Sequence, residues 1–145
     1  MQLASMNTYI GDVPGLGRGV FAAHDMQRGA VIEVCPVIVM PPEQVQYVDR
    51  TTLGAYYYTW GEDHQRAAIA LGHGSLYNHS YTPNARYRKD FERDVLTFVC
   101  LTSVRQGEEI RVNYNGDPED RAPLWFDVLE DVDTEPQLAI SDRAS

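Results

Sequence analysis

A chain of 145 residues with 43% apolar and 23% charged side chains has the size and composition of one globular domain with its own core. No window holds the roughly 18 consecutive apolar residues that a membrane helix needs, so we expect no association with a membrane. The formal net charge of -9 disfavours binding to the phosphates of nucleic acids, so we expect no direct nucleic-acid partner.

The negative charge is concentrated at the C-terminal end of the chain. Residues 117–145 hold nine acidic residues and two arginines, hence -7, whereas the preceding residues amount to -2. An acidic end of this kind attracts a basic partner or simply remains solvated. We predict a single domain over residues 1–132 and a flexible acidic tail over residues 133–145, where TEPQLAISDRAS shows no periodicity.

The N-terminus and the cysteines indicate a reducing compartment. The opening residues MQLASMNTYIG lack the basic flank and apolar run of a secretory signal, so we expect a cytoplasmic protein, with nuclear or host-cell targeting left open. Cys35 and Cys100 lie in apolar runs and form no CxxC pair, which predicts two buried thiols that act as small hydrophobic groups.

Short apolar runs separated by turn residues dominate the chain. In chain order, strands are predicted over residues 19–23, 30–40, 56–60, 94–104 and 108–114. Helices are predicted over residues 41–50, which opens with two prolines, and over residues 123–132. In an extended chain Tyr56, Tyr58 and Trp60 share one face, and we favour sheet packing for them over a role in a binding channel. The fold class is therefore mainly β, with short strands, small sheets and few short helices.

Three segments contain residues suited to ligand binding. The first is PGLGRGVFAA, residues 14–23, whose glycines let the backbone approach a ligand without a Cβ in the way. An extended run follows it instead of a helix, so it is not a dinucleotide-binding GxGxxG motif. A flexible turn is the alternative interpretation.

The second segment is NHSYTPN, residues 78–84. Asn78 and His79 offer donors and acceptors together, and Pro83 fixes a bend that brings Asn84 within reach of neighbouring backbone. A hydrogen-bonded structural corner is the alternative, whereas a metal site built on His73 and His79 lacks a third ligand at recognisable spacing.

The third segment is GEEIRVNYNG, residues 107–116, in which a glycine turn precedes a strand that ends at Tyr114. By itself it predicts a hairpin with a half-buried tyrosine. In this order and spacing, however, the three segments resemble the SET-domain protein lysine methyltransferases, with their GxG strand entry, NHSxxPN segment and GEE turn before a catalytic tyrosine. The resemblance extends from about Thr8 to Gly116. It implies a β-clip fold with a C-terminal pseudoknot that places Asn78 and His79 beside Tyr114.

The resemblance implies S-adenosyl-L-methionine as the cofactor. The backbone of the glycine segment would face the methionine end, the Asn-His pair would hold the amino and adenine parts, and two aromatic residues could cover the adenine or simply anchor a helix. The residues assigned to the cofactor are Gly17, Arg18, Gly19, Val20, Asn78, His79, Tyr114, Trp125 and Phe126.

The chemistry of methyl transfer explains a tyrosine-rich site. A lysine with a pKa of about 10.4 must lose its proton before it attacks, which costs roughly 4 to 5 kcal/mol at neutral pH. A dry aromatic channel opposes the ammonium form and positions the nitrogen. By resemblance Tyr114 and Tyr87 are the catalytic tyrosines, and the channel walls are Tyr9, Tyr87 and Tyr114.

Two departures from the family pattern affect the expected function. Gly116 occupies a position that influences how many methyl groups are added, so the product is not predicted. The cysteine-rich zinc cluster that follows many SET domains is missing from this sequence. We expect an enzyme that methylates lysine on a basic, histone-like protein, and a homodimer that completes its groove is a further possibility. The alternatives are a SET-like module that binds cofactor or peptide without turnover and an unrelated small β-domain.

Overall fold

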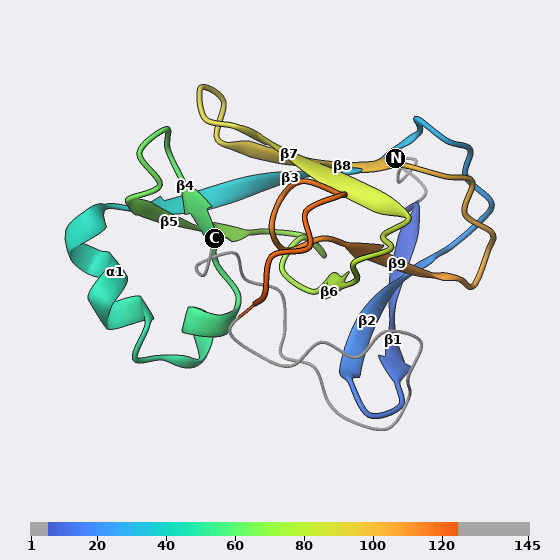
Figure 1. Cartoon of the computed structure of the whole chain (residues 1–145), viewed down its shortest axis with the longest axis horizontal. Helices are drawn as coiled ribbons and strands as arrows, with labels where there is room; N and C mark the ends of the chain where they lie inside the picture. The colour runs from blue at the N-terminus through green and yellow to red at the C-terminus, as the bar shows by residue number, and fades with distance from the viewer. Residues whose placement is uncertain (1–5, 125–145) are drawn as a thin grey trace, which may run out of the picture.

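The computed structural model describes residues 6–124, and its strands form two sheets (Figure 1). A short α-helix and a 3-10 helix lie between β3 and β4. In chain order the elements are β1 Thr8–Val13, β2 Gly17–Ala22, β3 Val31–Met40, α1 Pro42–Val48, η1 Thr52–Ala55, β4 Tyr58–Trp60, β5 Arg66–Ala70, β6 Asn78–His79, β7 Ala85–Asp90, β8 Val95–Cys100 and β9 Glu109–Val112. The expected mainly-β fold with few short helices is confirmed.

The two sheets differ in how their strands are connected. The larger sheet has the order β4-β5-β3-β8-β7 and is antiparallel throughout. The smaller sheet has the order β1-β2-β9-β6, and its β6–β9 pair is parallel. In Figure 1 the β1–β2 hairpin extends below the larger sheet, with β9 and β6 between the two. Because parallel neighbours need a long connection, the β7–β8 hairpin lies between β6 and β9 in sequence.

The predicted elements match the structure where hydrophobic periodicity is strong. All five predicted strands coincide with β2, β3, β4, β8 and β9, and α1 falls within the predicted helix 41–50. The strands not predicted are β1, β5, β6 and β7. β5 is rich in alanine, which disfavours strands, and β6 has only two residues. The predicted helix 123–132 and tail 133–145 fall almost wholly outside the described residues.

The strand β4 is covered on both faces. Tyr58 and Trp60 are fully buried, as sheet packing predicts, but Tyr57 and Thr59 on the other face are also buried. Tyr57 donates a hydrogen bond to Asp49 at the end of α1, at 2.9 Å. Lys89 of β7 donates to the carbonyl and hydroxyl oxygens of Thr59 at 2.8 and 3.1 Å. Asp49 and Lys89 therefore contact the face that the alternation pattern alone would leave to solvent.

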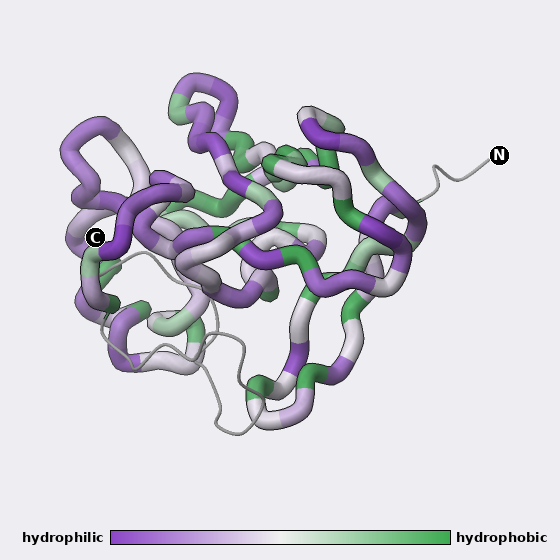
Figure 2. Tube along the Cα trace, turned by 45° about the vertical axis from the view of Figure 1, so that its right-hand side comes forward, coloured by the Kyte–Doolittle hydropathy of each residue, from purple (hydrophilic) through white to green (hydrophobic). Residues whose placement is uncertain are grey.

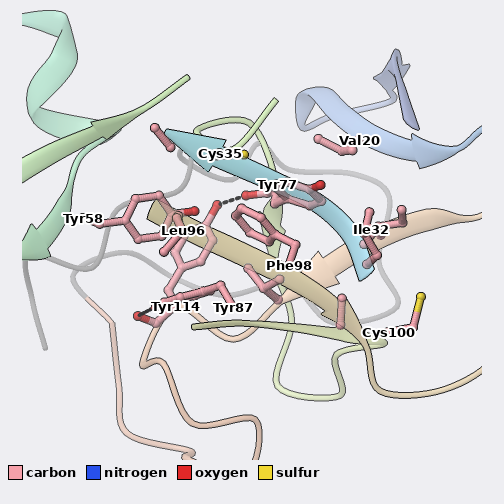
Figure 3. Close-up of a cluster of buried hydrophobic side chains, with 14 of the residues drawn as sticks. Val20, Ile32, Cys35, Tyr58, Tyr77, Tyr87, Leu96, Phe98, Cys100 and Tyr114 are labelled. Carbon is pink, nitrogen blue, oxygen red and sulfur yellow. Dashed lines mark hydrogen bonds between the residues drawn. The ribbon is translucent and has the colours of Figure 1, made fainter. Parts of the chain in front are cut away.

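An aromatic cluster fills the core between the sheets (Figure 3). Phe98 on β8 is fully buried, with its ring stacked on Tyr77 at a centroid distance of 4.1 Å and tilted against Tyr87 at 6.1 Å. Cys35 and Cys100 are buried free thiols, as predicted. Figure 2 shows hydrophilic residues gathered in turns, among them the β7–β8 turn. Within residues 6–124, no helix is long and apolar enough to cross a membrane.

Two phenylalanines on the same hairpin test the importance of this cluster. Phe98→Ala opens a cavity between the sheets and should lower the free energy of unfolding by about 3 to 5 kcal/mol. Phe91→Ala removes a partly buried ring at the β7–β8 turn that contacts Trp60 at 5.1 Å, and should lose less than half as much. Urea denaturation of both variants measures the difference, and equal losses would contradict the assignment of the core.

Candidate active site

The parallel β6–β9 pair brings two distant segments together. Asn78 lies opposite Arg111 and His79 opposite Val112. One residue beyond β6, the Ser80 amide donates to the Val112 carbonyl at 2.9 Å. The expected proximity of the Asn-His pair to the segment that ends at Tyr114 is therefore present.

Asn84 fastens the same strand from its other edge. Its side-chain Nδ2 donates to the Glu109 carbonyl at 2.9 Å, and its Oδ1 accepts from the Arg111 amide at 2.9 Å. The amide side chain thus pairs with β9 as a strand backbone would. The sequence predicted that a bend at Pro83 brings Asn84 to neighbouring backbone, and Asn84 does contact the backbone of β9.

Beyond Tyr114 the chain turns back along the segment that follows β6. The Tyr81 hydroxyl donates to the Ala122 carbonyl at 2.9 Å, and the Asn115 side chain donates to the same carbonyl at 2.9 Å. The Asn113 side chain donates to the Asp120 carbonyl at 2.6 Å. The two asparagines fold residues 113–122 into a turn, and the Tyr81 bond holds this turn against the segment that follows β6, as expected for the crossing of a pseudoknot.

Tyr114 is fully buried and held at both ends. Its amide donates to His79 Nδ1 at 2.9 Å. Its hydroxyl donates to the Tyr77 carbonyl at 2.8 Å, and both tyrosines are labelled in Figure 3. Burial, followed by the nearby Glu109, raises the pKa of the Tyr114 phenol well above its usual value. The hydroxyl therefore remains protonated near neutral pH and acts as a hydrogen-bond donor of fixed direction.

Tyr87 lies beside Tyr114 in the same cluster. Its hydroxyl donates to the Tyr114 carbonyl at 3.2 Å, and its ring meets Tyr58 edge to face at a centroid distance of 5.1 Å. A Cβ at Gly116 would lie 3.7 Å from the Tyr87 hydroxyl, so the position left open by this glycine borders Tyr87. The structure thus brings together both predicted catalytic tyrosines.

The glycine segment contacts the Asn-His pair. Asn78 Nδ2 donates to the Arg18 carbonyl at 3.0 Å and to Glu109 Oε2 at 2.7 Å. A Cβ at Gly19 would lie 2.9 Å from Val13 Cγ2 and 3.0 Å from Asn78 Nδ2, so only glycine permits this approach. Gly17 has a φ of +87° and open space at its Cβ position, so it supplies a turn that other residues disfavour.

These contacts show how the segment fits a cofactor. The Val20 side chain is fully buried in the core, and Val20 is paired with Ile10 of β1 and Ile110 of β9, so its contact with a cofactor stays a prediction. Residues 17–19 are paired with β1 only, and their backbone and the Asn78 side chain form one polar surface around a glycine without a Cβ. Such a surface suits the amino and carboxylate groups of an amino-acid ligand, and the methionine end of S-adenosylmethionine carries both.

His79 is buried as a neutral imidazole. Burial and, to a lesser extent, the positive charge of Arg111 lower the pKa of His79 from 6.5 to about 4. Because Nδ1 accepts a hydrogen bond from the Tyr114 amide, the imidazole proton of this neutral form lies on Nε2. The ring also meets Tyr81 and Tyr114 edge to face, at centroid distances of 4.5 and 5.0 Å.

The two histidines considered as metal ligands have different partners. His73 Nδ1 shares a hydrogen bond of 2.7 Å with Thr8 Oγ1, whereas His79 Nδ1 binds the Tyr114 amide. Among the described residues no group of three or more His, Cys, Asp or Glu side chains could hold a metal ion. The structure thus gives the metal alternative no support.

Tyr9 lies apart from the other predicted channel residues. It is 44% exposed on β1, and its ring stacks on Phe21 of β2 at a centroid distance of 5.6 Å. Its role as a channel wall stays a prediction. Trp125 and Phe126, predicted to cover the adenine, lie outside the described residues.

Three functional candidates emerge only from the structure. Tyr77 supplies the carbonyl that accepts the Tyr114 hydroxyl, Glu109 accepts from Asn78, and Glu33 accepts from the Tyr77 hydroxyl at 2.8 Å. Glu33 is the only charged residue in the apolar run VIEVCPVIVM, and Tyr77 directly precedes Asn78. A charge inside an apolar run is the one sequence signal that could have pointed to Glu33.

The lowered pKa of His79 predicts a pH-dependent stability. The unfolded chain binds a proton near pH 6.5, whereas the folded protein resists protonation down to about pH 4. The contribution of neutral His79 is therefore complete above pH 6.5 and declines as the pH falls towards 4, by up to about 3 kcal/mol. Urea unfolding at pH 7 and pH 5 should show a larger loss for the wild type than for His79→Asn, which retains an acceptor for the Tyr114 amide. Equal losses would contradict this role.

Comparison with known proteins identifies the family. Residues 17–115 match the SET domain, and this range contains the whole second segment, residues 17–23 of the first and residues 107–115 of the third. The chain is 34% identical over 119 residues to the histone-lysine N-methyltransferase of Schizosaccharomyces pombe that is specific for H3 lysine 37. This match covers 81% of the chain and 76% of the relative.

Solved structures have the same fold. A candidate histone methyltransferase from Plasmodium falciparum superimposes with a TM-score of 0.60 at 25% identity, over 77% of this chain and 95% of that one. The Chaetomium thermophilum Polycomb Repressive Complex 2, solved with bound S-adenosylmethionine, gives a TM-score of 0.65 at 17% identity, over 79% of this chain and 16% of that one. The family match, together with the convergence of the three segments at a buried tyrosine, shows that this chain belongs to the SET-domain protein lysine methyltransferases.

Proposed function

We propose that this SET enzyme transfers methyl groups from S-adenosylmethionine to a lysine of a basic, histone-like protein, with Tyr114 as the central catalytic residue. One observation carries the assignment of the site. The Tyr114 hydroxyl, buried and bonded to the Tyr77 carbonyl, lies in the same cluster as the His79 ring and the Tyr87 hydroxyl. Asn78 links this cluster directly to the glycine segment.

The residues proposed for the cofactor surround the contact between β2 and β6. The bound cofactor supplies a sulfonium methyl group that an amine can attack. Backbone groups of residues 17–20 and the polar side chain of Asn78 bind its amino-acid end. His79, neutral at physiological pH, offers a hydrogen bond and an apolar ring without adding a positive charge beside a cationic ligand.

The tyrosines act on the lysine. Desolvation against Tyr87 and Tyr114 disfavours the ammonium form and so promotes loss of the lysine proton before attack. Because its raised pKa keeps the Tyr114 phenol protonated, Tyr114 orients the reacting groups and does not act as the base. Their aromatic faces also accommodate a methylated, cationic product through cation-π attraction.

Charge supports a basic protein as the substrate. The net charge is -9, and carboxylates at Asp117, Glu119 and Asp120 follow directly after the catalytic tyrosine. Asp117 and Glu119 are exposed in the described structure. Such a field attracts a positively charged peptide and speeds its encounter with the site. The fission-yeast relative, which acts on histone H3, is consistent with this choice.

Removal of the Tyr114 hydroxyl tests the catalytic assignment. Tyr114→Phe should reduce methyl transfer by about 100-fold or more, because the site loses a preorganised hydrogen-bond group. Tyr47→Phe is the matched control, since Tyr47 is 60% exposed on α1, and its rate should match the wild type. The measurement is tritium incorporation from labelled cofactor into histones or a lysate, followed by mass spectrometry of the modified lysines.

Two outcomes would count against this function. Full activity of Tyr114→Phe would remove Tyr114 from the catalytic role. Tight binding of S-adenosylhomocysteine by a wild type that methylates nothing would favour the module without turnover.

The cofactor assignment is tested by calorimetry with S-adenosylhomocysteine. Asn78→Ala removes the hydrogen bonds to Arg18 and Glu109, and should weaken the affinity about tenfold or more. Asn7→Ala is the control, because Asn7 also bonds a backbone carbonyl, that of Ile32 at 2.9 Å, but between β1 and β3. Equal affinities of the two variants would place the cofactor elsewhere.

A further inference from the structure

The Glu33 side chain extends from β3 on the core-facing side of the larger sheet. The pairing of β3 with β8 shifts register between Val31 and Glu33, as a β-bulge does. Beyond this shift Glu33 lies on the same side of β3 as Cys35, which is 1% exposed. The bulge thus turns an acidic side chain to the side on which the aromatic cluster lies.

Both carboxylate oxygens of Glu33 accept hydrogen bonds from one short segment. Oε1 accepts from the Tyr77 hydroxyl at 2.8 Å, and Oε2 accepts from the His73 amide at 2.8 Å. Gly72, with a φ of +65°, lies so close that a Cβ there would collide with the carboxylate. A single side chain therefore holds residues 73–77 at their two ends.

The held segment leads directly to the catalytic hydroxyl. Tyr77 is fully buried and stacked on Phe98, and burial next to Glu33 raises the pKa of its phenol well above the usual value, so it stays a donor. The carbonyl of this same residue accepts from the Tyr114 hydroxyl at 2.8 Å. Tyr77 thus joins Glu33 to Tyr114: its hydroxyl bonds the Glu33 carboxylate, and its carbonyl bonds the Tyr114 hydroxyl.

We propose that Glu33 is a positioning residue for methyl transfer: its carboxylate fixes the segment from His73 to Tyr77, and the Tyr77 carbonyl in turn fixes the Tyr114 hydroxyl. The inference rests on the proposed function of Tyr114. In this proposal Glu33 acts through Tyr77 and does not itself contact the cofactor or the lysine. Small displacements of catalytic groups by such distant contacts reduce rates by up to about 100-fold.

The test removes each end of the Glu33–Tyr77 bond. Tyr77→Phe deletes one oxygen and keeps the stacked ring, and Glu33→Gln keeps the shape but cannot accept both donors. We expect kcat per cofactor-binding molecule to fall about 10-fold or more in each variant, with the affinity for S-adenosylhomocysteine unchanged within twofold. The double variant should be no slower than the slower single variant, because both changes break one interaction.

The chain contains a matched control pair. The Tyr57 hydroxyl donates to Asp49 at 2.9 Å, so it forms the same phenol–carboxylate bond between α1 and β4. Tyr57→Phe and Asp49→Asn should lower the melting temperature and leave kcat unchanged. A loss of kcat in the control pair as large as in the Glu33–Tyr77 pair would overturn the proposal, since both effects would then be structural.

Amide hydrogen exchange gives a readout that is independent of activity. In Glu33→Gln, exchange in the peptide 73–79 should rise at least tenfold relative to the wild type, because the His73 amide loses its charged acceptor. Unchanged exchange in Glu33→Gln would overturn this inference, and so would an unchanged kcat in Tyr77→Phe. If the wild type is active, both outcomes leave the proposed function intact. An inactive wild type that still binds S-adenosylhomocysteine would overturn both.

Discussion

The parallel pairing of β6 with β9 is the contact on which the site depends. It spans only two residues on β6, so its own backbone bonds are few. Side chains complete it: Asn84 bonds the Glu109 carbonyl and the Arg111 amide on one edge of β9, and His79 accepts from the Tyr114 amide, two residues beyond β9. The polar residues around this pair therefore stabilise the fold as well as form the site, because their hydrogen bonds replace the backbone hydrogen bonds that a longer strand would supply.

Burial keeps the central groups of the site uncharged. The pKa of His79 is lowered and the pKa of Tyr114 is raised, so both are neutral over a wide pH range. Carboxylates lie one step further out, where Glu109 accepts from Asn78 and Glu33 accepts from Tyr77. A neutral interior with charged supports suits a reaction in which a neutral amine attacks a cationic methyl donor, because a fixed charge at the centre would favour the wrong protonation state of lysine.

The core and the site share the same side chains. Tyr58, Tyr77 and Phe98 fill the space between the sheets, and Tyr87 and Tyr114 extend the cluster to the proposed channel (Figure 3). Packing at interior density leaves these rings little freedom, which holds the two tyrosine hydroxyls in place. Stability and activity are consequently coupled in this protein, and a rate must be compared with the folded, cofactor-binding fraction of each variant.

The sequence by itself determined the mainly-β class, the helix α1, the buried thiols and the three segments that converge at Tyr114, because strand periodicity, turn residues and motif order are local properties. Only the tertiary structure decided that Tyr57 and Thr59 are covered, that Tyr9 stacks on Phe21, and that Glu33 turns inward to reach Tyr77. These features depend on a register shift in β3, on the bond from Lys89 of β7 to Thr59 of β4, and on a parallel pair with a hairpin between its strands. All of them involve residues far apart in the chain, which no local pattern encodes.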